Sequence, residues 1–344
     1  MEKPVGVIGA GSFGSTIASL ISENKSVLIY SRNQFEIDNI NQGKEHKGIT
    51  FAKNVTATGD LKYLAESCNL IFPVIPAGAF RKVIKQIAPY ITPLHIIIHA
   101  TKGLDIVEAD IEDLGNKTFD KDIIRTMSQV ITEECSTLRV GCISGPNLSK
   151  EINLSYPTAA VIASEFQEVI DQGQIALSSS RFFVFGSHQL LTAELAGAFK
   201  NIIAIGSGII GGKHLGKNMQ ALLITRGLRE IIHIGIALGA EGKAFLGTAG
   251  LGDLIATATS ETSRNYNFGR RLAEGDTIEQ IRASEDEVAE GVRTLKIVKY
   301  ILTKYNLHAP ICELIYEIVF KDLNIDKAIS HLMRYPNAPD VDFL

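Results

Sequence analysis

The first half of the chain alternates short apolar runs with longer segments in which apolar residues recur at helical spacing. Ser15–Glu23 and Ala79–Ile87 are segments of the second kind. Strands that alternate with helices are typical of βαβ units, whose strands lie parallel in one sheet. We therefore predict an α/β fold with a doubly wound, mostly parallel sheet that continues to about Ser187. The predicted strands are Val5–Ile8, Val27–Tyr30, Leu70–Ile75, His95–His99, Val140–Ser144, Thr158–Ala163 and Phe182–Phe185.

The pattern changes beyond Ser187. From Leu190 to Leu332 the apolar residues keep helical spacing and almost no stretch alternates, which indicates an all-helical domain. Glycine clusters predict breaks between helices at Gly206–Gly216 and Gly247–Gly252. We expect two domains, residues 1–187 built on the sheet and residues 188–344 built from helices.

One segment of the first half, Asp105–Arg139, departs from the alternation of strands and helices. It contains acidic, helix-like turns. It also contains a polar stretch, Gly115–Asp122, which we expect to form an exposed loop between two elements.

The composition is that of an ordinary globular protein. The 344 residues are 45% hydrophobic and 21% charged, and 34 basic side chains nearly balance 38 acidic ones. This balance favours neither a nucleic-acid nor a membrane partner. The longest apolar stretches, Ala193–Gly212 and Ala221–Ala240, are interrupted by charged residues, so we expect buried helices there. Because no signal peptide is recognisable before Val5, we expect a cytoplasmic protein.

The cysteines and histidines predict neither disulfides nor a metal site. The cysteines are scattered and form no C-x-x-C pair, which is typical of reduced thiols. His95 and His99 have the spacing of zinc ligands on a helix, but the residues between them predict a strand. The four cysteines are Cys68, Cys135, Cys142 and Cys312.

A glycine-rich loop, Gly9-Ala10-Gly11-Ser12-Phe13-Gly14, follows the first predicted strand and opens a predicted helix. This is the context that the dinucleotide-binding fingerprint of a Rossmann domain requires. Gly9 allows the tight turn, Gly11 lets the backbone approach a pyrophosphate, and Gly14 lets helix and strand pack closely. The alternative is a plain glycine-rich turn before a helix. The loop identifies a class of cofactor and leaves the reaction open.

Further motifs follow the glycine loop in a fixed order. They are Ala100-Thr101-Lys102-Gly103-Leu104, Ile143-Ser144-Gly145-Pro146-Asn147, Phe199-Lys200-Asn201, Thr248-Ala249-Gly250-Leu251-Gly252-Asp253-Leu254, Ser263-Arg264-Asn265 and Glu290-Gly291. With the glycine loop, this set resembles the bacterial NAD(P)-dependent glycerol-3-phosphate dehydrogenase family over almost the whole chain. The chain departs from that family at Asn147-Leu148-Ser149, in a shortened stretch Asn41–Val55, and in the long segment Asp105–Arg139.

The resemblance implies a Rossmann domain followed by a helical domain, with the active site in the cleft between them. It also implies a cytosolic homodimer that reduces dihydroxyacetone phosphate to sn-glycerol 3-phosphate for phospholipid synthesis with NADP(H) or NAD(H). By the same matching, Lys200 is the expected acid/base, and Lys102 and Asp253 are further expected catalytic residues. The expected substrate-binding residues are Lys102, Gly145, Asn147, Lys200, Asp253, Ser263, Arg264 and Asn265. The expected cofactor-binding residues are Gly9, Gly11, Ser12, Phe13, Gly14, Arg32, Lys102, Ser149, Arg264 and Glu290.

Lys200 is the candidate for the group that protonates the product oxygen. Reducing a ketone places negative charge on the carbonyl oxygen, so an acid must lie beside it and donate a proton. Gly197, Ala204 and Gly208 share the helix face of Lys200, which leaves room for a ligand or a backbone. The alternative is a surface lysine that extends from an amphipathic helix.

Other candidates follow from their expected positions. Lys102 directly follows a predicted strand, at the sheet edge where ligands of doubly wound folds bind, although it is alternatively a solvated strand-end lysine. Asp253 is either an N-cap of the next helix or a partner of Lys200 and the substrate. A basic residue near a helix start is unfavourable unless an anion binds there. Arg264 is therefore interpreted as part of a phosphate grip, with an exposed surface arginine as the alternative.

The residues after the second predicted strand favour NADP(H) over NAD(H). NAD-selective Rossmann domains place an acid about twenty residues past the fingerprint, where it holds the ribose 2′-hydroxyl. Here Ser31 and Arg32 stand at that place and could donate hydrogen bonds to a 2′-phosphate, and Glu36 lies in the following helix. Arg32 alternatively stacks on the adenine or points to solvent.

Two other functions remain compatible with parts of this pattern. A related dehydrogenase could act on a β-hydroxy acid or a nucleotide sugar, but the expected phosphate grip at Arg264 argues against it. A non-catalytic sensor could bind NAD(P), but the joint presence of Lys102, Lys200 and Asp253 argues against that function.

Overall fold

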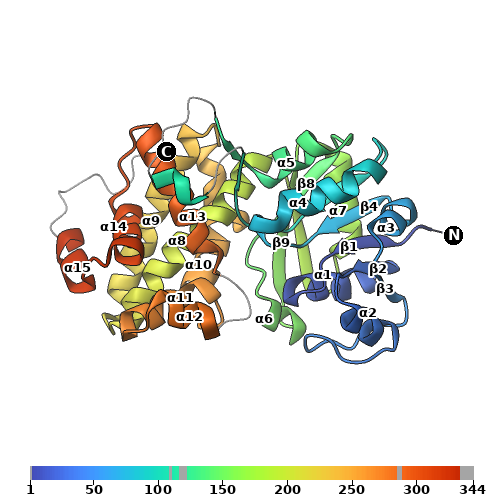
Figure 1. Ribbon diagram of the computed structural model, residues 1–344, viewed down its shortest axis with the longest axis horizontal. Coiled ribbons are helices and arrows are strands. Elements are labelled where there is room, and N and C mark those ends of the chain that lie inside the picture. The colour runs from blue at the N-terminus through green and yellow to red at the C-terminus, as the bar shows by residue number, and fades with distance from the viewer. Residues whose placement is uncertain (1, 108–110, 116–121, 285–288, 334–344) are drawn as a thin grey trace. The chain divides into compact units, whose positions relative to one another are not determined.

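The computed structural model describes residues 2–107, 111–115, 122–284 and 289–333 (Figure 1). The chain divides into two compact units. The sheet unit comprises Met1–Asp105 and Arg125–Leu190, and the helical unit comprises Ile106–Ile124 and Leu191–Leu344.

The sheet unit contains one large sheet in the order β10-β9-β8-β5-β4-β1-β2-β3. Neighbouring strands are parallel except β8 and β9, which pair antiparallel, so the predicted mostly parallel sheet is confirmed. The strands are β1 (Val5–Ile8), β2 (Val27–Tyr30), β3 (Val55–Thr58), β4 (Leu70–Pro73), β5 (Ile96–His99), β8 (Val140–Ser144), β9 (Thr158–Ser164) and β10 (Phe182–Ser187). The sequence reading missed β3, because four residues with only two buried side chains give too short an alternation to stand out.

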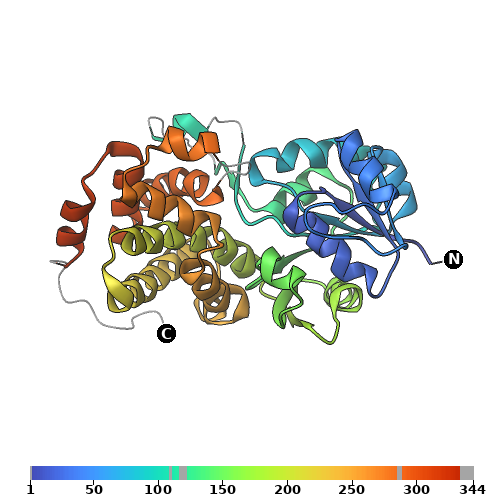
Figure 2. The same ribbon diagram turned by 90° about the horizontal axis from the view of Figure 1, so that it is seen from below.

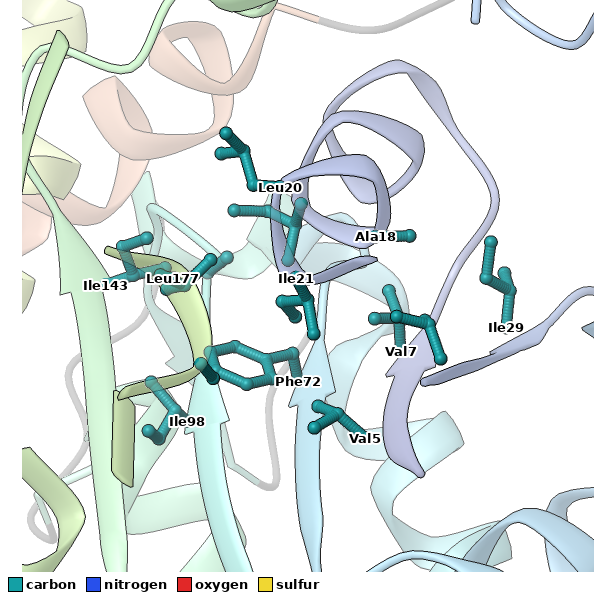
Figure 3. Close-up of a cluster of buried hydrophobic side chains, with 14 of the residues drawn as sticks. Val5, Val7, Ala18, Leu20, Ile21, Ile29, Phe72, Ile98, Ile143 and Leu177 are labelled. Carbon is teal, nitrogen blue, oxygen red and sulfur yellow. The ribbon is translucent and has the colours of Figure 1, made fainter. Parts of the chain in front are cut away.

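Helices cover both faces of this sheet, and consecutive strand residues serve opposite cores. Val7, Phe72 and Ile98 belong to one core, which α1, α2, α6 and α7 cover. Ile8, Ile71 and Ile97 belong to the other, which α3, α4 and α5 cover. Figure 3 shows Ala18 and Ile21 of α1 above Val7 and Phe72 of the sheet. The helices are α1 (Ser12–Ser22), α2 (Gln34–Asn41), α3 (Leu61–Ser67), α4 (Ala77–Ile87), α5 (Met127–Glu134), α6 (Ser149–Asn153) and α7 (Gln167–Leu177).

In the helical unit, the described residues from 191 onward form helices and turns without any strand, as the sequence predicts. The orange and red C-terminal helices lie beside the yellow helix pair α8 and α9 in Figure 2. The helices are α8 (Leu190–Gly212), α9 (Gly216–Ala237), α10 (Asp253–Thr259), α11 (Arg264–Glu274), α12 (Ile278–Ser284), α13 (Glu290–Lys304), α14 (Pro310–Lys321) and α15 (Ile325–Met333). Helix α8 is apolar and long enough to cross a membrane, but 94% of its most apolar window is buried inside the fold.

The break predicted at Gly206–Gly216 is confirmed, because α8 ends at Gly212 and α9 begins at Gly216. The glycines of this cluster that lie inside α8 allow a close helix crossing. A Cβ on Gly208 would overlap the carbonyl oxygen of Tyr266 in α11, and a Cβ on Gly269 would overlap that of Ile205. This glycine seam, Gly208 with Gly269, brings the two backbones into direct contact, and that contact outweighs the low helix propensity of glycine.

The long segment after β5 leaves the sheet unit and returns to it. Two short paired strands, β6 (Asp105–Ile106) and β7 (Ile124–Arg125), begin and end the excursion. Between them, a turn of 3₁₀-helix, Ile111–Gly115, packs on α13 of the helical unit. Lys296 of α13 forms an ion pair with Glu112, and Lys304 lies 3.6 Å from Asp122. Most of the exposed loop that we predicted for residues 115–122 lies outside the described residues, which here omit 116–121.

A buried glutamate holds the beginning of α14. The two carboxylate oxygens of Glu230 in α9 accept hydrogen bonds from the backbone N–H groups of Ile311 and Cys312, at 2.8 and 2.9 Å. These are groups that the helix itself leaves unsatisfied. Burial raises the pKa of Glu230 from its ordinary value of 4.5 to about 7, although the two backbone N–H groups act to lower it.

This raised pKa predicts a specific pH dependence of stability. Between pH 4.5 and 7 the folded chain keeps a proton on Glu230 that the unfolded chain has released, so the free energy of unfolding should fall as pH rises. The loss should amount to at most about 3 kcal/mol. Urea denaturation across this pH range should show the decline in the wild type and lose that component in Glu230→Gln. The variant Glu317→Gln, which removes another carboxylate of α14, should retain it. Parallel wild-type and Glu230→Gln curves would contradict the assignment.

Candidate active site

The glycine loop between β1 and α1 has the geometry of a phosphate cradle. Gly9 adopts φ +115°, and a Cβ there would overlap the carbonyl oxygen of Val74. A Cβ on Gly14 would overlap the carbonyl oxygen of Gly9, so only glycine allows the helix to start this close to the strand. The N-cap Gly11 offers no side-chain hydrogen bond to the N-terminus of α1, which Ser12 and Phe13 begin. Backbone N–H groups at such a start bind a pyrophosphate well, so the loop fits a dinucleotide.

His46 supports this loop, and the sequence reading missed it. The His46 side chain is buried and its Nε2 lies 2.7 Å from the carbonyl oxygen of Ala10, which we interpret as a donated hydrogen bond. His46 lies in the stretch 41–55, which looked shortened relative to the family. The imidazole of His46 therefore joins this stretch to the glycine loop. A single histidine in a polar stretch carries no sequence signal for such a contact.

The end of β2 carries the residues predicted to select the cofactor. Gly9 donates its N–H to the carbonyl oxygen of Tyr30 at 3.0 Å, which joins the end of β2 to the glycine loop. Ser31 is buried, and its hydroxyl donates to Glu36 Oε2 at 2.5 Å. Arg32 is exposed, and no hydrogen bond or ion pair of its side chain occurs among the described residues. The structure therefore leaves Arg32 available to a ligand, whereas the Ser31 proton is already donated.

Lys102 and Asn147 follow two neighbouring parallel strands, β5 and β8. Lys102 Nζ donates to the carbonyl oxygen of Gly145 at 2.9 Å, and Gly145 adopts φ +112°. Asn147 is 9% exposed, and its Nδ2 donates to the carbonyl oxygen of Ser144 at 3.2 Å. Its Oδ1 is buried without a hydrogen-bond partner among the described residues. A buried carbonyl oxygen of this kind is costly unless a ligand or water donates to it.

These residues of the sheet unit lie along one edge. The glycine loop follows β1, Ser31 and Arg32 follow β2, and Lys102 follows β5. Because these strands are parallel, their carboxyl ends meet at the same edge of the sheet, where doubly wound folds bind ligands. Ser149, the first residue of α6, follows β8 at that edge.

The helical unit carries a buried charged cluster of Lys200, Asp253 and Thr257. Lys200 and Asp253 are only 5% and 1% exposed, although they lie in or beside apolar helices. Lys200 Nζ donates to Asp253 Oδ1 and, at 2.5 Å, to Thr257 Oγ1. Thr257 in turn lies 3.3 Å from Asp253 Oδ1. Of the two interpretations of Asp253, the structure shows the partner of Lys200, and Gly252 occupies the N-cap of α10.

Thr257 is a member of this cluster that the sequence reading did not identify. It stands four residues after Asp253 on α10, and residues at that spacing share a helix face. The spacing could have suggested it, once α10 was known to start at Asp253.

A relay of buried amides joins the three helices that meet next to Lys200. Asn265 Nδ2 donates to Asn201 Oδ1 at 2.9 Å, and Gly291 donates its N–H to Asn265 Oδ1 at 2.9 Å. The carboxamide oxygen and one amide proton of Asn265 therefore bind protein groups, which gives this predicted substrate ligand a structural role. The relay fixes the beginnings of α11 and α13 relative to α8.

Ser263, Arg264 and Glu290 stand at those helix beginnings. Ser263 is the N-cap of α11, and its hydroxyl accepts the N–H of Tyr266 at 3.3 Å. Arg264 is the first residue of α11 and is exposed, so the predicted helix start is confirmed. Glu290 is the first residue of α13. A helix start favours an anion, and Arg264 adds a forked donor to it.

The described residues hold no group of three or more histidine, cysteine, aspartate or glutamate side chains placed to bind a metal. His95 Nε2 lies 2.9 Å from the carbonyl oxygen of Ala65, and His99 packs edge-on against Phe80. The four cysteines carry free thiols. Burial raises the pKa of Cys68 to about 12, which makes that thiol a poor nucleophile.

Known proteins resemble this chain over nearly its whole length. The family model described as NAD-dependent glycerol-3-phosphate dehydrogenase N-terminus matches residues 4–170, and its C-terminus counterpart matches residues 189–330. A glycerol-3-phosphate dehydrogenase (NAD(P)+) of Pseudomonas aeruginosa is 35% identical, with 100% of this chain and 98% of the relative covered. The Acinetobacter baylyi protein of the same name is 36% identical, with 99% and 92% covered. A solved glycerol-3-phosphate dehydrogenase from Coxiella burnetii superposes with a TM-score of 0.86 at 29% identity, covering 97% of this chain and 99% of that one.

The buried pairing of Lys200 with Asp253 predicts a strong asymmetry between single and double variants. Asp253→Ala should lower the free energy of unfolding by about 3–5 kcal/mol, because it leaves a buried ammonium group without its counter-charge. Lys200→Met combined with Asp253→Leu should recover most of that loss, since it removes both charges and fills their volume. Urea midpoints of the three proteins measure the effect. Equal losses in the single and double variants would contradict the predicted recovery.

Proposed function

The chain belongs to the NAD-dependent glycerol-3-phosphate dehydrogenase family, and we propose that it reduces dihydroxyacetone phosphate to sn-glycerol 3-phosphate with Lys200 as acid/base. Members of this family are NAD(P)-dependent oxidoreductases, and so is this chain. The observation that carries the proposal is the buried Lys200 ammonium group, which Asp253 and Thr257 hold in place on a largely apolar, buried helix.

Hydride transfer from a reduced nicotinamide to the carbonyl carbon is the chemistry that the bound cofactor supplies. The carbonyl oxygen then becomes an alkoxide, and Lys200 Nζ stabilises this charge and donates a proton to it. Asp253 keeps the amine charged and oriented between turnovers, and Thr257 accepts a second hydrogen bond from it. The amine recovers its proton from solvent, so the reaction consumes one proton in total. The reverse reaction uses the neutral amine of Lys200 as the base.

The remaining predicted site residues are assigned to binding. The glycine loop and the open start of α1 hold the pyrophosphate of the cofactor. Lys102 and the unpaired Oδ1 of Asn147 face the ligand from the carboxyl ends of β5 and β8. At the start of α11, Arg264 binds the substrate phosphate. Ser149 and Glu290 are proposed to lie along the cofactor.

We propose NADP(H) as the favoured cofactor, with NAD(H) also accepted. Arg32 supports this choice, since it is exposed, without a partner among the described residues, and placed at the end of β2. Ser31 does not support it as the sequence reading suggested, because its hydroxyl proton is donated to Glu36. The proposed setting is a cytoplasmic homodimer that supplies glycerol 3-phosphate to phospholipid synthesis.

The decisive experiment follows the absorbance of reduced cofactor in the presence of dihydroxyacetone phosphate. The wild type should consume cofactor, and Lys200→Met should lower kcat by roughly 10²–10⁴, the usual loss for a positioned acid/base. Methionine fills the space of the lysine stem, so cofactor binding should persist in this variant. Near-normal turnover of Lys200→Met would exclude Lys200 as the proton donor. A wild type that binds cofactor but never turns over would favour the sensor function instead.

Replacing Arg264 tests the phosphate assignment. Arg264→Ala should weaken binding of dihydroxyacetone phosphate by about 1.5–3 kcal/mol, the value of a lost charge-assisted hydrogen bond, and raise its KM accordingly. Unphosphorylated dihydroxyacetone lacks the anion, so its kcat/KM should hardly change. Arg270→Ala is the matched control, because Arg270 lies on the same helix and pairs with Glu274 at 3.7 Å. Equal losses with both substrates would assign Arg264 a structural role.

A further inference from the structure

The carboxylate of Glu36 lies at the end of β2, although the Glu36 backbone belongs to the next helix, α2. Glu36 is in the first turn of α2, five residues after Ser31, and sequence spacing alone places it away from the cofactor. In the folded chain its Oε2 lies 2.5 Å from Ser31 Oγ. Ser31 directly follows β2, so the Glu36 side chain extends from α2 to the end of that strand.

We infer that Glu36 is a cofactor-specificity residue that weakens the preference for NADP(H) conferred by Arg32. In this assignment Arg32 attracts a 2′-phosphate, Glu36 repels it, and Glu36 together with Ser31 suits the ribose 2′-hydroxyl. The inference rests on the proposed use of a nicotinamide dinucleotide, and it explains how one chain accepts both forms of that cofactor.

The position of the carboxylate supports this inference. Rossmann domains that select NAD place an acid at the end of the second strand, where it accepts a hydrogen bond from the ribose 2′-hydroxyl. Here Tyr30, the last residue of β2, accepts the N–H of Gly9 in the glycine loop, and the next residue, Ser31, donates to the Glu36 carboxylate. These two hydrogen bonds connect the carboxylate to the proposed pyrophosphate cradle through adjacent residues. The glycine geometry of that cradle fits the cofactor independently of Glu36.

The hydrogen bonds of Ser31 define what the site offers to each cofactor. Ser31 Oγ accepts the N–H of Asn33 at 3.1 Å and donates its proton to Glu36. The hydroxyl therefore has no proton left for a phosphate while Glu36 stays in place. A 2′-phosphate would bring nearly two negative charges close to a carboxylate, whereas a 2′-hydroxyl would bring a donor.

The same contacts also allow a purely structural role. Asn33 is the N-cap of α2, so the chain of hydrogen bonds through Ser31 to Glu36 resembles an extended helix cap. Glutamine at position 36 separates the two roles, because it can still accept the Ser31 proton but carries no charge. A cap alone would leave the choice of cofactor unchanged in that variant.

The test measures binding directly, by calorimetric titration of the full-length protein with NADH and with NADPH. Glu36→Gln should tighten NADPH binding roughly tenfold, the effect of removing a charge within a few ångströms of a phosphate, and should leave NADH equal or slightly weaker. Arg32→Ala should weaken NADPH binding and spare NADH. The gain in Glu36→Gln should shrink at high salt, since it is electrostatic.

Asp38→Asn is the matched control. Asp38 lies on the same helix, is exposed and accepts a hydrogen bond from Gln34 at 2.8 Å, so its replacement removes the same charge without touching Ser31. An equal gain in both variants would reduce the effect to long-range charge and overturn the inference. An unchanged NADPH-to-NADH ratio in Glu36→Gln would overturn it and leave the proposed function intact. A wild type that binds neither cofactor would overturn the proposed function, and this inference with it.

Discussion

The buried charge of Lys200 is the constraint on which the helical unit depends. An ammonium group inside an apolar helix is costly unless a counter-charge and further hydrogen bonds accompany it. Asp253 and Thr257 meet that need from one face of α10, which therefore has to begin at Asp253 and pack against α8. The glycine-rich π-helical turn Thr248–Gly252 makes this start possible, because a Cβ on Gly250 would overlap the carbonyl oxygen of Phe245. The position of the proposed acid/base therefore depends on the packing of α10 against α8.

Small residues and amides place the other helices around that charge. The glycine seam of Gly208 and Gly269 brings α11 into backbone contact with α8. The relay from Asn201 through Asn265 to Gly291 then fixes the first turns of α11 and α13. Because a buried hydrogen-bonded network restricts the arrangements of the helices that it joins, it orients the first turns that carry Arg264 and Glu290. Residues that look like substrate ligands in the sequence can therefore act as the scaffold of the site.

In the sheet unit, the predicted site residues lie in short loops at one edge of the sheet. Parallel strands bring the glycine loop, Arg32, Lys102 and Asn147 to the same side, although more than a hundred residues separate the first from the last. Side chains then join the loops to one another, as Lys102 does with Gly145 and His46 with Ala10. The chain-specific stretches that depart from the family pattern contribute to these supports. The long excursion after β5 likewise is attached to the helical unit through α13.

The sequence by itself determined the alternation of strands and helices, the helical second half and the glycine loop, because these depend on local periodicity and on the steric needs of glycine. It also identified Lys200 and Asp253 as candidates, because the motifs that contain them resemble those of a known family and because small residues share the helix face of Lys200. Only the tertiary structure decided that Asp253 pairs with Lys200 and that α8 continues through its glycines, because both depend on α10 and α11, more than forty residues away in the chain. The same holds for Glu36, whose carboxylate returns to the end of β2. Spacing along a chain gives the position of a backbone, whereas the direction of a long side chain is set by the partners that folding brings within its reach.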